Sequence, residues 1–416
     1  MTVRRLFACA IGALWLAFAA NAQEKVQTPL AAKPAAPIIL VSVDGFAARY
    51  LSASATPNLW KLAETGAYAR SVRPTFPSLT FPNHYSIVTG LHPDRHGIVD
   101  NTFEDKTLGL FKLGDVAEQL DGRWWEQAEP IWITATKHGL TAAVNSWVGG
   151  EALINGVRPK YWTHYEKAIA AETRVQTLLD FLSLQESKRP DFLTLYFDEV
   201  DTQGHLFGPE SPELATALKR TDAAIGSLLE GINKLGLTNK VDIVVVSDHG
   251  MAALGENNRV MLNDYADMSK LRVIPREATA VTLAKIEFLE SDKAQAVQLS
   301  GRHGAMECWR REDLPPRFHY GKNDRIAAML CLADVGWLIE TKGHDQTSFE
   351  RGAHGYDPDA PEMGAIFIAN GPSFKRGLVL DKIGIVDVYP VVMGALGLAP
   401  LENDGDPAVA KAVLAR

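Results

Sequence analysis

The fold of this chain is decided by one short stretch, Pro37-Ile38-Ile39-Leu40-Val41-Ser42-Val43-Asp44-Gly45. The part from Pro37 to Val43 is a nearly continuous apolar run, which is typical of a β-strand buried on both faces of its sheet. Strands of this kind belong to parallel sheets, whose two faces are both covered by helices. The run ends at Asp44, so a carboxylate follows directly after the predicted strand.

The same pattern recurs along the chain. Further buried strands are predicted at residues 140–147, 191–197, 241–246 and 365–369. Helices are predicted between them, including one that begins at Thr56-Pro57 and a long amphipathic one that begins at Ser211-Pro212. Strands alternating with helices predict an α/β fold, with a mostly parallel central sheet flanked by helices on both faces. Ligands bind to such sheets beyond the carboxyl ends of the strands.

The N-terminal segment indicates export. Arg4 and Arg5 precede an apolar run that continues to Ala20, and Ala20-Asn21-Ala22 fits a cleavage site, so residues 1–22 are predicted to be a signal peptide. The alternative is an uncleaved membrane anchor, for which the run is short. Residues 23–36 are rich in Ala, Pro and Lys and are predicted to be a flexible lead-in. The catalytic domain would then comprise residues 37–416.

The charge of the mature chain limits its partners. Cleavage removes two of the 42 basic side chains and none of the 50 acidic ones, which leaves a net charge of −10. Such a protein has no general attraction for nucleic acid polymers. We therefore expect small-molecule partners, no membrane anchor after signal cleavage, and a periplasmic or secreted location.

Between Met251 and Gly352 the alternation of strands and helices weakens. We interpret about 252–352 as an inserted subdomain beside the active site. It contains the two cysteines that remain after cleavage, Cys308 and Cys331. In an exported protein a disulfide between them is favoured over two free thiols. Two sulfurs without CxxC spacing do not suit a zinc–thiolate site.

A candidate nucleophile lies in the run Phe76-Pro77-Ser78-Leu79-Thr80-Phe81-Pro82-Asn83-His84-Tyr85. Pro82 suits the first turn of a helix, which is predicted from Asn83 to Gly90. Thr80 would then lie at the helix N-terminus, where free N–H groups favour negative charge. A threonine hydroxyl is a nucleophile only when a base or a metal ion activates it. Taken alone, Thr80 would be an ordinary helix cap.

Carboxylates and imidazoles gather at the predicted strand ends. The set consists of Asp44, Asp201, His205, Asp248, His249 and His354. Carboxylate and imidazole ligands without thiolates suit Zn²⁺ or a similar divalent ion. Each residue alone is unremarkable in sequence, but together with an activatable hydroxyl on the same edge of the sheet they predict a metal-dependent hydrolase.

Several motifs occur in an order that makes a family resemblance specific. They are Asp44-Gly45-Phe46, Thr56-Pro57-Asn58-Leu59, the run from Phe76 to Tyr85, Val88-Thr89-Gly90-Leu91, His96-Gly97-Ile98-Val99-Asp100-Asn101, Asp201 to His205, Asp248-His249-Gly250 and His354-Gly355-Tyr356-Asp357. In this order they resemble the nucleotide pyrophosphatase/phosphodiesterase family of the alkaline phosphatase superfamily. The resemblance covers about residues 37–400 and implies an alkaline-phosphatase-like fold.

The resemblance implies a site with two Zn²⁺ per chain. One ion would be held by Asp44, Thr80, Asp248 and His249, and the other by Asp201, His205 and His354. The Asp201-x-x-x-His205 motif selects Asp201 as the ligand over its neighbours Asp198 and Glu199. Four positive charges would then face three carboxylates and a threonine alkoxide.

The resemblance also implies roles around the substrate. Thr80 would be the nucleophile, and Asn101 with the backbone N–H of Phe81 would steady a non-bridging phosphoryl oxygen. Phe81, Tyr165 and Tyr196 would surround the base and sugar of a nucleotide. The expected activity is zinc-dependent hydrolysis of nucleotide phosphodiester and pyrophosphate bonds to nucleoside 5′-monophosphates, through a phosphothreonine intermediate.

The sequence leaves alternatives open. Relatives often carry Lys before the threonine, whereas this chain has Leu79. Ser78 is a rival hydroxyl, and we interpret His84 as structural. The runner-up function is a related metal-dependent hydrolase of phosphate monoesters, phosphonates or lipid head-group phosphodiesters. A binding protein without catalysis is a third possibility, against which the intact nucleophile and ligand set argue.

Overall fold

The structure is a computed structural model that describes residues 30–274, 280–289, 293–342 and 350–415. The predicted signal peptide, residues 1–22, and the first part of the predicted lead-in lie outside these residues. Within the described part of the chain, no helix has both the length and the apolar character needed to cross a membrane.

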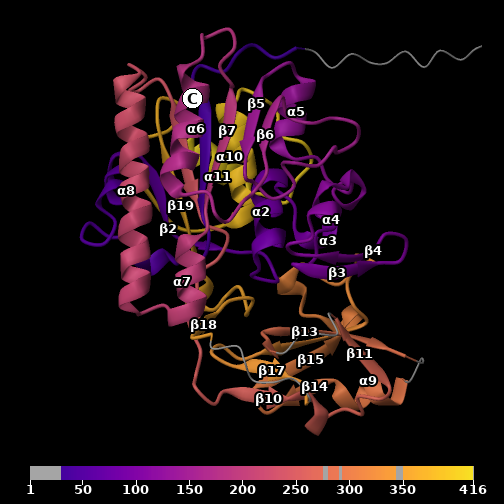
Figure 1. The fold of residues 1–416 in the computed structure, drawn as a ribbon. Coiled ribbons are helices and arrows are strands. Elements are labelled where there is room, and N and C mark those ends of the chain that lie inside the picture. Colours follow the sequence, from indigo (N-terminus) through magenta and orange to yellow (C-terminus); the bar gives the residue numbers. More distant parts are fainter. Residues whose placement is uncertain (1–29, 275–279, 290–292, 343–349, 416) are drawn as a thin grey trace, which may run out of the picture.

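An eight-stranded sheet forms the centre of the molecule, in the order β20-β2-β19-β8-β1-β7-β5-β6 (Figure 1). From edge to edge its strands are Leu378–Gly384, Ala67–Arg73, Ala365–Asn370, Asp242–Val246, Ile38–Val43, Phe192–Phe197, Ala142–Asn145 and Tyr161–Thr163. All pairs are parallel except those of β19, which is antiparallel to both β8 and β2. The predicted α/β fold with a mostly parallel sheet is confirmed.

Two details of the sheet differ from the sequence expectations. The strand predicted at 140–147 is shorter and covers Ala142–Asn145. β19 runs against its neighbours because the chain enters it from the carboxyl end of the other strands. The Gly250 N–H, just beyond β8, donates to the carbonyl oxygen of Met363, which lies two residues before β19. Apolar content identifies such a strand but does not give its direction.

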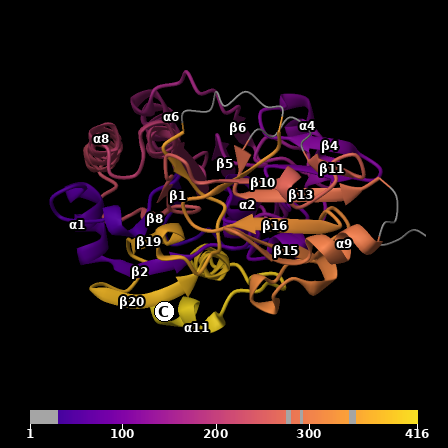
Figure 2. The same ribbon diagram turned by 90° about the horizontal axis from the view of Figure 1, so that it is seen from below.

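Helices cover both faces of the sheet because the side chains of each strand alternate between two cores. On β1, Ile38 and Leu40 pack into one core, whereas Ile39, Val41 and Val43 pack into the other. The first core is closed by α2 (Thr80–Thr89), α5 (Ile131–Lys137) and α10 (Val388–Ala395). The second is closed by α1 (Pro57–Thr65), α6 (Ala171–Ser183), α7 (Glu199–Phe207) and α8 (Pro212–Lys234). Figure 2 shows α8 end-on.

Local signals set the helix ends. The Ser211 side chain accepts the Leu214 N–H at 3.1 Å and caps α8, as the Ser-Pro-Glu sequence predicts. α2 begins at Thr80, three residues before the predicted start at Asn83, and Leu79 is its N-cap. It ends at Gly90, whose φ of 69° is readily adopted by glycine.

The chain between β8 and β19 adds two smaller sheets, drawn in orange in the lower part of Figure 1. The larger has the order β11-β13-β16-β15-β14, with strands Leu271–Ile274, Leu283–Phe288, Met329–Ala333, Met306–Arg310 and Gly301–His303. The other has the order β10-β17-β12, with strands Arg259–Met261, Leu338–Glu340 and Ala280–Val281. A separate core lies among them. We retain an inserted subdomain at about 252–352 as our proposal for the domain organisation.

Two short connections border this region. The strands β9 (Ala252–Ala253) and β18 (Gly352–Ala353) pair where the chain leaves and re-enters the main body. The hairpin of β3 (Thr102–Asp105) and β4 (Gly109–Lys112) extends from the main body toward the larger of the two added sheets (Figure 1). The predicted Cys308–Cys331 disulfide is present and joins directly paired residues of β15 and β16.

Candidate active site

The predicted site residues meet at the carboxyl end of the central sheet. Asp44 follows β1 directly, Asp201 lies in the first turn of α7 after β7, and Asp248 follows β8. Since β1 lies between β7 and β8, the three carboxylates come to neighbouring positions on one edge. Thr80 begins α2, and His354 follows β18.

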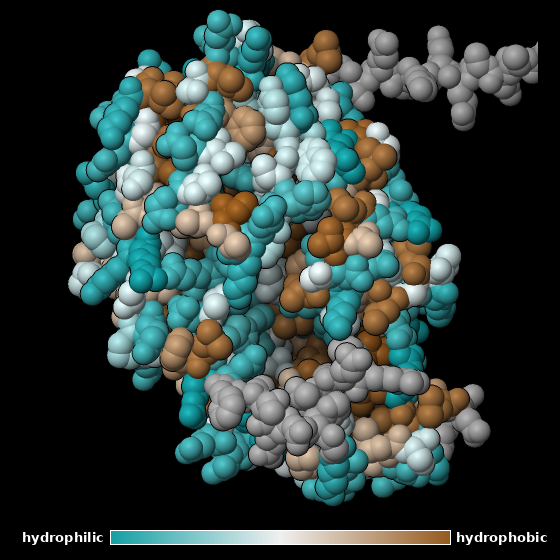
Figure 3. Space-filling view, in the orientation of Figure 1, coloured by the Kyte–Doolittle hydropathy of each residue, from teal (hydrophilic) through white to brown (hydrophobic). Residues whose placement is uncertain are grey.

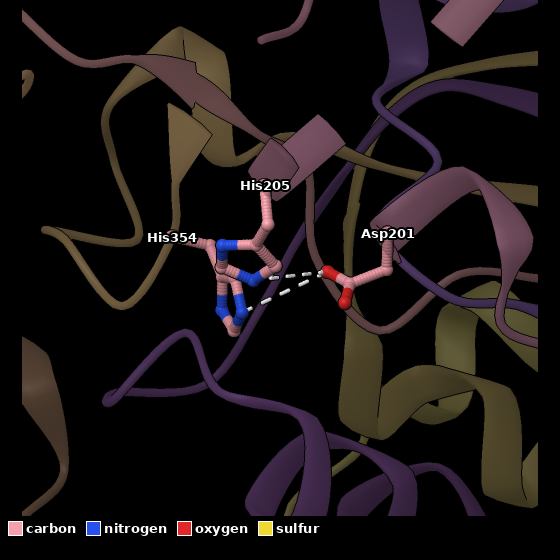
Figure 4. Close-up of side chains that lie close together, drawn as sticks. All are labelled: Asp201, His205 and His354. Carbon is pink, nitrogen blue, oxygen red and sulfur yellow. Dashed lines mark ion pairs between the residues drawn. The ribbon is translucent and has the colours of Figure 1, made fainter. Parts of the chain in front are cut away.

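One cluster consists of Asp201, His205 and His354 (Figure 4). One turn of α7 separates Asp201 from His205, so their side chains leave the same face of the helix. Asp201 Oδ1 lies 3.5 Å from His205 Nε2 and 3.8 Å from His354 Nε2. The candidate ligand atoms of this group all lie within 4.8 Å of one another, so they could hold one metal ion together.

A second cluster lies beside the first, around His249. Its Nε2 atom is 3.0 Å from Asp248 Oδ2, 3.6 Å from Asp44 Oδ1 and 3.4 Å from Thr80 Oγ1. By the same 4.8 Å criterion, two overlapping groups of candidate ligands lie here. One consists of Asp44, Asp201 and His249, and the other of Asp44, His84 and Asp248. The overlap means that the two clusters adjoin.

A backbone carbonyl group orients each of the three histidines expected to bind metal. The Nδ1 atoms of His205, His249 and His354 lie 3.0, 2.9 and 2.9 Å from the carbonyl oxygens of Gly352, Gly250 and Ser78, respectively. A carbonyl oxygen can only accept, so each Nδ1 carries the proton. Each Nε2 therefore keeps its lone pair, and the Nε2 atoms are those that face the carboxylates. This arrangement is typical of metal-binding imidazoles.

Each carboxylate of the two clusters keeps one buried oxygen without a hydrogen-bond partner: Asp44 Oδ1, Asp201 Oδ1 and Asp248 Oδ2. Burial, together with the charges of Asp248 and Asp201, raises the pKa of Asp44 well above its ordinary value. A bound cation would satisfy these oxygens and relieve their mutual repulsion. Carboxylate, imidazole and hydroxyl donors without thiolates therefore fit zinc or a similar divalent ion.

The histidines of the site differ in their electrostatic surroundings. Burial lowers the pKa of His354 well below its ordinary value, and the nearby His249 and His205 lower it further. Burial also acts to lower the pKa of His249, but the Asp248 and Asp201 carboxylates and the hydrogen bond to the Gly250 carbonyl group together raise it. His354 is therefore neutral at physiological pH, which is the state that a metal ligand requires.

His84, which we interpreted as structural, and Ser78, the rival hydroxyl, both have hydrogen-bond partners outside the clusters. His84 is fully buried, with Nδ1 2.9 Å from the carbonyl oxygen of Thr80 and Nε2 2.8 Å from Ser42 Oγ. Both of its ring nitrogens thus have partners, although the ring lies beside the second cluster. The Ser78 hydroxyl donates to the carbonyl oxygen of Tyr356 at 3.0 Å. Of the two candidate hydroxyls, that of Thr80 lies against the cluster.

A pocket of about 330 Å³ opens beside Thr80 and Asp44. Phe81, Tyr165 and Tyr196, the three aromatic residues expected around the nucleotide, all line it. The Tyr196 hydroxyl donates to Asp44 Oδ2 at 2.5 Å, which ties one wall of the pocket to the carboxylate cluster. The Tyr165 side chain is at the rim, where its residue is 39% exposed and its hydroxyl donates to Asp198 Oδ2 at 2.8 Å.

A second hollow, of about 380 Å³, lies on the other side of the clusters, between the main body and the smaller sheets. Its walls include His205, His354, Asn101 and Lys285. Figure 3 shows this face of the molecule hollowed between the main body and the smaller sheets. The candidate metal ligands therefore lie between two spaces, one of them rich in aromatic side chains.

Asn101 lies next to the helix that Thr80 begins. Its Oδ1 accepts the Phe81 N–H at 2.9 Å. That Asn101 and this N–H together steady a phosphoryl oxygen stays a prediction. The NH₂ group of the Asn101 side chain is left as the donor.

Sequence reasoning missed several residues around the site. Leu113, Gln119 and Trp147 line the first pocket, and Ser42 holds His84. Trp147 was placed at the end of a predicted strand, and Ser42 inside one, as ordinary core positions. The other residues belong to short segments without a motif, so their sequence gave no sign of a role in the site.

Comparison with known proteins identifies the family. The model of the type I phosphodiesterase / nucleotide pyrophosphatase family matches residues 38–357. The chain belongs to this enzyme family. It is 36% identical over 381 residues to an uncharacterized pyrophosphatase/phosphodiesterase of Schizosaccharomyces pombe, a match that covers 88% of this chain and 78% of the relative.

Other members of the type I phosphodiesterase / nucleotide pyrophosphatase family are longer. The chain is 37% identical over 377 residues to a venom phosphodiesterase of Macrovipera lebetinus, and 37% identical over 378 residues to ectonucleotide pyrophosphatase/phosphodiesterase family member 3 of Rattus norvegicus. Each match covers 89% of this chain but only 44% and 43% of those relatives. The chain thus spans less than half of their length.

Solved structures of the same family have the same fold. Murine ectonucleotide pyrophosphatase/phosphodiesterase 5 superposes with a TM-score of 0.84 at 31% identity, covering 91% of this chain and 100% of that one. An inactive threonine-to-alanine variant of the murine protein, in complex with AMP, gives a TM-score of 0.85 at 30% identity. These matches confirm the alkaline-phosphatase-like fold.

Proposed function

We propose that this chain is a zinc-dependent phosphodiesterase and pyrophosphatase that hydrolyses nucleotides to nucleoside 5′-monophosphates through a phosphothreonine at Thr80. One observation carries the proposal. Thr80 Oγ1 lies 3.4 Å from His249 Nε2, next to three carboxylates that each have a buried oxygen without a hydrogen-bond partner. A hydroxyl in such a place can be activated only with positive charge nearby.

We assign the ligand sets as the family resemblance implies, and the adjoining clusters support this assignment. Asp44, Thr80, Asp248 and His249 would hold one zinc ion, and Asp201, His205 and His354 the other. When bound, the two ions would supply the positive charge that lowers the pKa of the Thr80 hydroxyl and balances charge on the phosphoryl group. The carbonyl groups that fix each Nδ1 keep the imidazoles in the required tautomer.

The protein residues would then divide the reaction between them. Thr80 Oγ1 attacks phosphorus, the bond to the leaving oxygen breaks, and water later hydrolyses the phosphothreonine. The Asn101 NH₂ group donates to a non-bridging oxygen, where charge builds up in the transition state. The inactivity of the threonine-to-alanine variant of the murine relative supports a threonine nucleophile here.

The two hollows suit a diester. Phe81, Tyr165 and Tyr196 would bind the nucleoside in the pocket beside Thr80, and the murine relative is known in complex with a nucleotide, AMP. The second hollow would receive the leaving group. The arginines nearest to Thr80 in sequence, Arg73 and Arg95, pair with Asp359 and Asp404, so they offer no extra charge for a dianionic monoester.

We also propose export by the signal peptide of residues 1–22. The Cys308–Cys331 disulfide supports an oxidising compartment, and relatives are named as venom and ecto enzymes. N-terminal sequencing of protein from a periplasmic or culture fraction should find a mature chain that begins near Gln23.

The substrate preference tests the proposed function. The kcat/KM value for the p-nitrophenyl ester of thymidine 5′-monophosphate should exceed that for p-nitrophenyl phosphate by at least about a hundredfold, a difference of about 2.7 kcal/mol in transition-state binding. A nucleoside triphosphate should yield the 5′-monophosphate and pyrophosphate. A preference for the monoester, or for a choline phosphodiester over every nucleotide, would favour the runner-up class.

A further inference from the structure

A lysine of the added sheet reaches the segment that carries Asn101. Lys285 lies within β13 and is buried, with 7% of the residue exposed. Its Nζ donates to Asp100 Oδ1 at 2.5 Å and to the carbonyl oxygen of Thr102 at 2.7 Å. Asp100 Oδ1 also accepts the Thr102 N–H at 3.0 Å. One ammonium group therefore holds the residues on both sides of Asn101.

Burial of the Lys285–Asp100 ion pair has a desolvation cost. Burying an ammonium group with a carboxylate removes both from water, and such a pair often gives no net stability over an apolar one. Asp100 is 3% exposed, and its second oxygen has no hydrogen-bond partner. Lys285 is thus the group that compensates the Asp100 charge. What the pair fixes is the backbone at Asn101.

Two other cations of the same region, Arg272 and Arg325, form ion pairs with residues that do not flank Asn101. Arg272 of β11 pairs with Glu104, and Arg325 pairs with Asp105. Both acceptors lie farther along β3, beyond Thr102. The added sheets are therefore tied to the β3 hairpin at several points, and Lys285 is bonded to the residues that flank Asn101.

We propose that Lys285 is a positioning residue, through which the added sheet holds the Asn101 side chain in place for the reaction. Asn101 Oδ1 in turn accepts the Phe81 N–H, directly after Thr80. A continuous series of contacts thus joins β13 to the nucleophile. A donor that is already in place needs no reorganisation when charge develops on a phosphoryl oxygen. The inference rests on the proposed function, and in particular on the role of Asn101.

A double-mutant cycle tests the inference. Lys285→Met is combined with Asp100→Asn, so that no unpaired charge stays buried. With the p-nitrophenyl ester of thymidine 5′-monophosphate, this paired variant should lower kcat by about ten- to a hundredfold and change KM by less than about threefold, because the lost interaction belongs to the transition state. Asn101→Ala should lower kcat by about 10²- to 10³-fold. All three changes together should lower kcat no further than Asn101→Ala, because nothing is left to position.

Arg272→Met combined with Glu104→Gln is the matched control. It removes an ion pair between the added sheets and β3 without touching residues 100–102, and it should leave kcat within about twofold of the parent value. Lys285→Arg keeps the charge and should lose less kcat than the paired variant, again only while Asn101 is present. Melting temperatures of all variants are measured alongside.

Two kinds of result would overturn the inference, one against the role of Lys285 and the other against the role of Asn101. If the paired variant lowers kcat by the same factor with and without Asn101, or if the control loses as much, Lys285 acts through general stability. If Asn101→Ala leaves kcat unchanged, the role of Asn101 in the proposed function is wrong and the positioning role falls with it. In either case hydrolysis of the diester by the parent enzyme still stands as a separate observation.

Discussion

At the scale of single residues, contacts outside the clusters decide which atom of each side chain faces inward. Three histidines donate from Nδ1 to carbonyl groups and present Nε2 to the carboxylates. His84 makes the same Nδ1 contact, but its Nε2 meets Ser42. All four residues are histidines, so the partner of Nε2 is what distinguishes a candidate metal ligand from a structural histidine.

The nucleophile can be tested against its neighbour. Thr80→Ala should lower kcat by about three orders of magnitude or more, because the attacking oxygen is lost. Thr80→Ser keeps the hydroxyl and should retain part of the activity. Ser78→Ala is the control: it removes a hydrogen bond to Tyr356, with a cost of about 1 kcal/mol in the free energy of unfolding, and should leave kcat nearly unchanged. If Ser78→Ala is the inactive variant, Thr80 is not the nucleophile.

The histidines can be tested by metal content. His354→Asn should reduce bound zinc from about two ions per chain to about one, because it removes one of three protein ligands from a site. His84→Asn should keep about two, since both ring nitrogens of His84 are already engaged. Elemental analysis of the folded, gel-filtered variants provides the measurement. Equal loss in both variants would make His84 a ligand.

At the scale of elements, parallel strands bring distant residues to one edge. β7, β1 and β8 are hydrogen-bonded neighbours, and the candidate carboxylates follow their ends. In the larger of the added sheets all neighbouring strands are antiparallel, and β16 is the middle strand, between β13 and β15. Cys331 of β16 is paired with Cys308 on one side and with Ala284 on the other, next to Lys285. The disulfide thus joins β15 to β16, and β16 in turn pairs with β13, the strand that carries the proposed positioning residue.

The disulfide should stabilise the added sheets. Replacing Cys308 and Cys331 together by alanine should lower the free energy of unfolding by about 3 kcal/mol, as the chain-entropy account gives for a loop of this length. Denaturant unfolding of parent and variant measures the difference. Reductant should weaken the parent and leave the variant unaffected. Mass analysis after alkylation without reductant should find no labelled thiol in the mature parent, and two labels would refute the bridge.

At the scale of the whole molecule, the candidate metal ligands lie where the main body meets the added sheets. Asp44, Asp201 and Asp248 come after strands of the main sheet, Asp201 in the first turn of α7, whereas His354 follows the strand by which the chain returns from the insertion. The second hollow is lined from both sides of this junction. Bound metal would therefore join parts of the chain that are far apart in sequence.

Removal of the metal should consequently destabilise the whole protein. A ligand present at about a hundred times its dissociation constant stabilises the native state by about 2.7 kcal/mol per site. Chelation should abolish turnover and lower Tm by several degrees, and added zinc should restore both. The His354→Asn variant should show a smaller drop in Tm on chelation, because one site is already weakened. Full activity and an unchanged Tm in metal-free protein would contradict the proposed metal site.

Strands buried on both faces were predictable because burial leaves a local signature. The sequences of β1, β7 and β8 are apolar runs, and the predicted ends of these strands lie within about one residue of the observed ends. The edge strands β6 and β20, and β2 next to β20, were missed because their exposed positions interrupt that signature. The direction of β19 was also missed, since it depends on where the chain enters the sheet.

The sequence by itself determined which residues could form the site, because strand ends, motif order and residue chemistry are local properties. Only the tertiary structure decided how those residues are used. The contact of Ser42 with His84 joins positions 42 residues apart, and that of Lys285 with Asp100 joins positions 185 apart. Spacings of this size carry no signal in a single sequence. They are set by the packing of α2 on the central sheet and of β13 on the segment before β3, which places a side chain beside a partner that neither local sequence specifies.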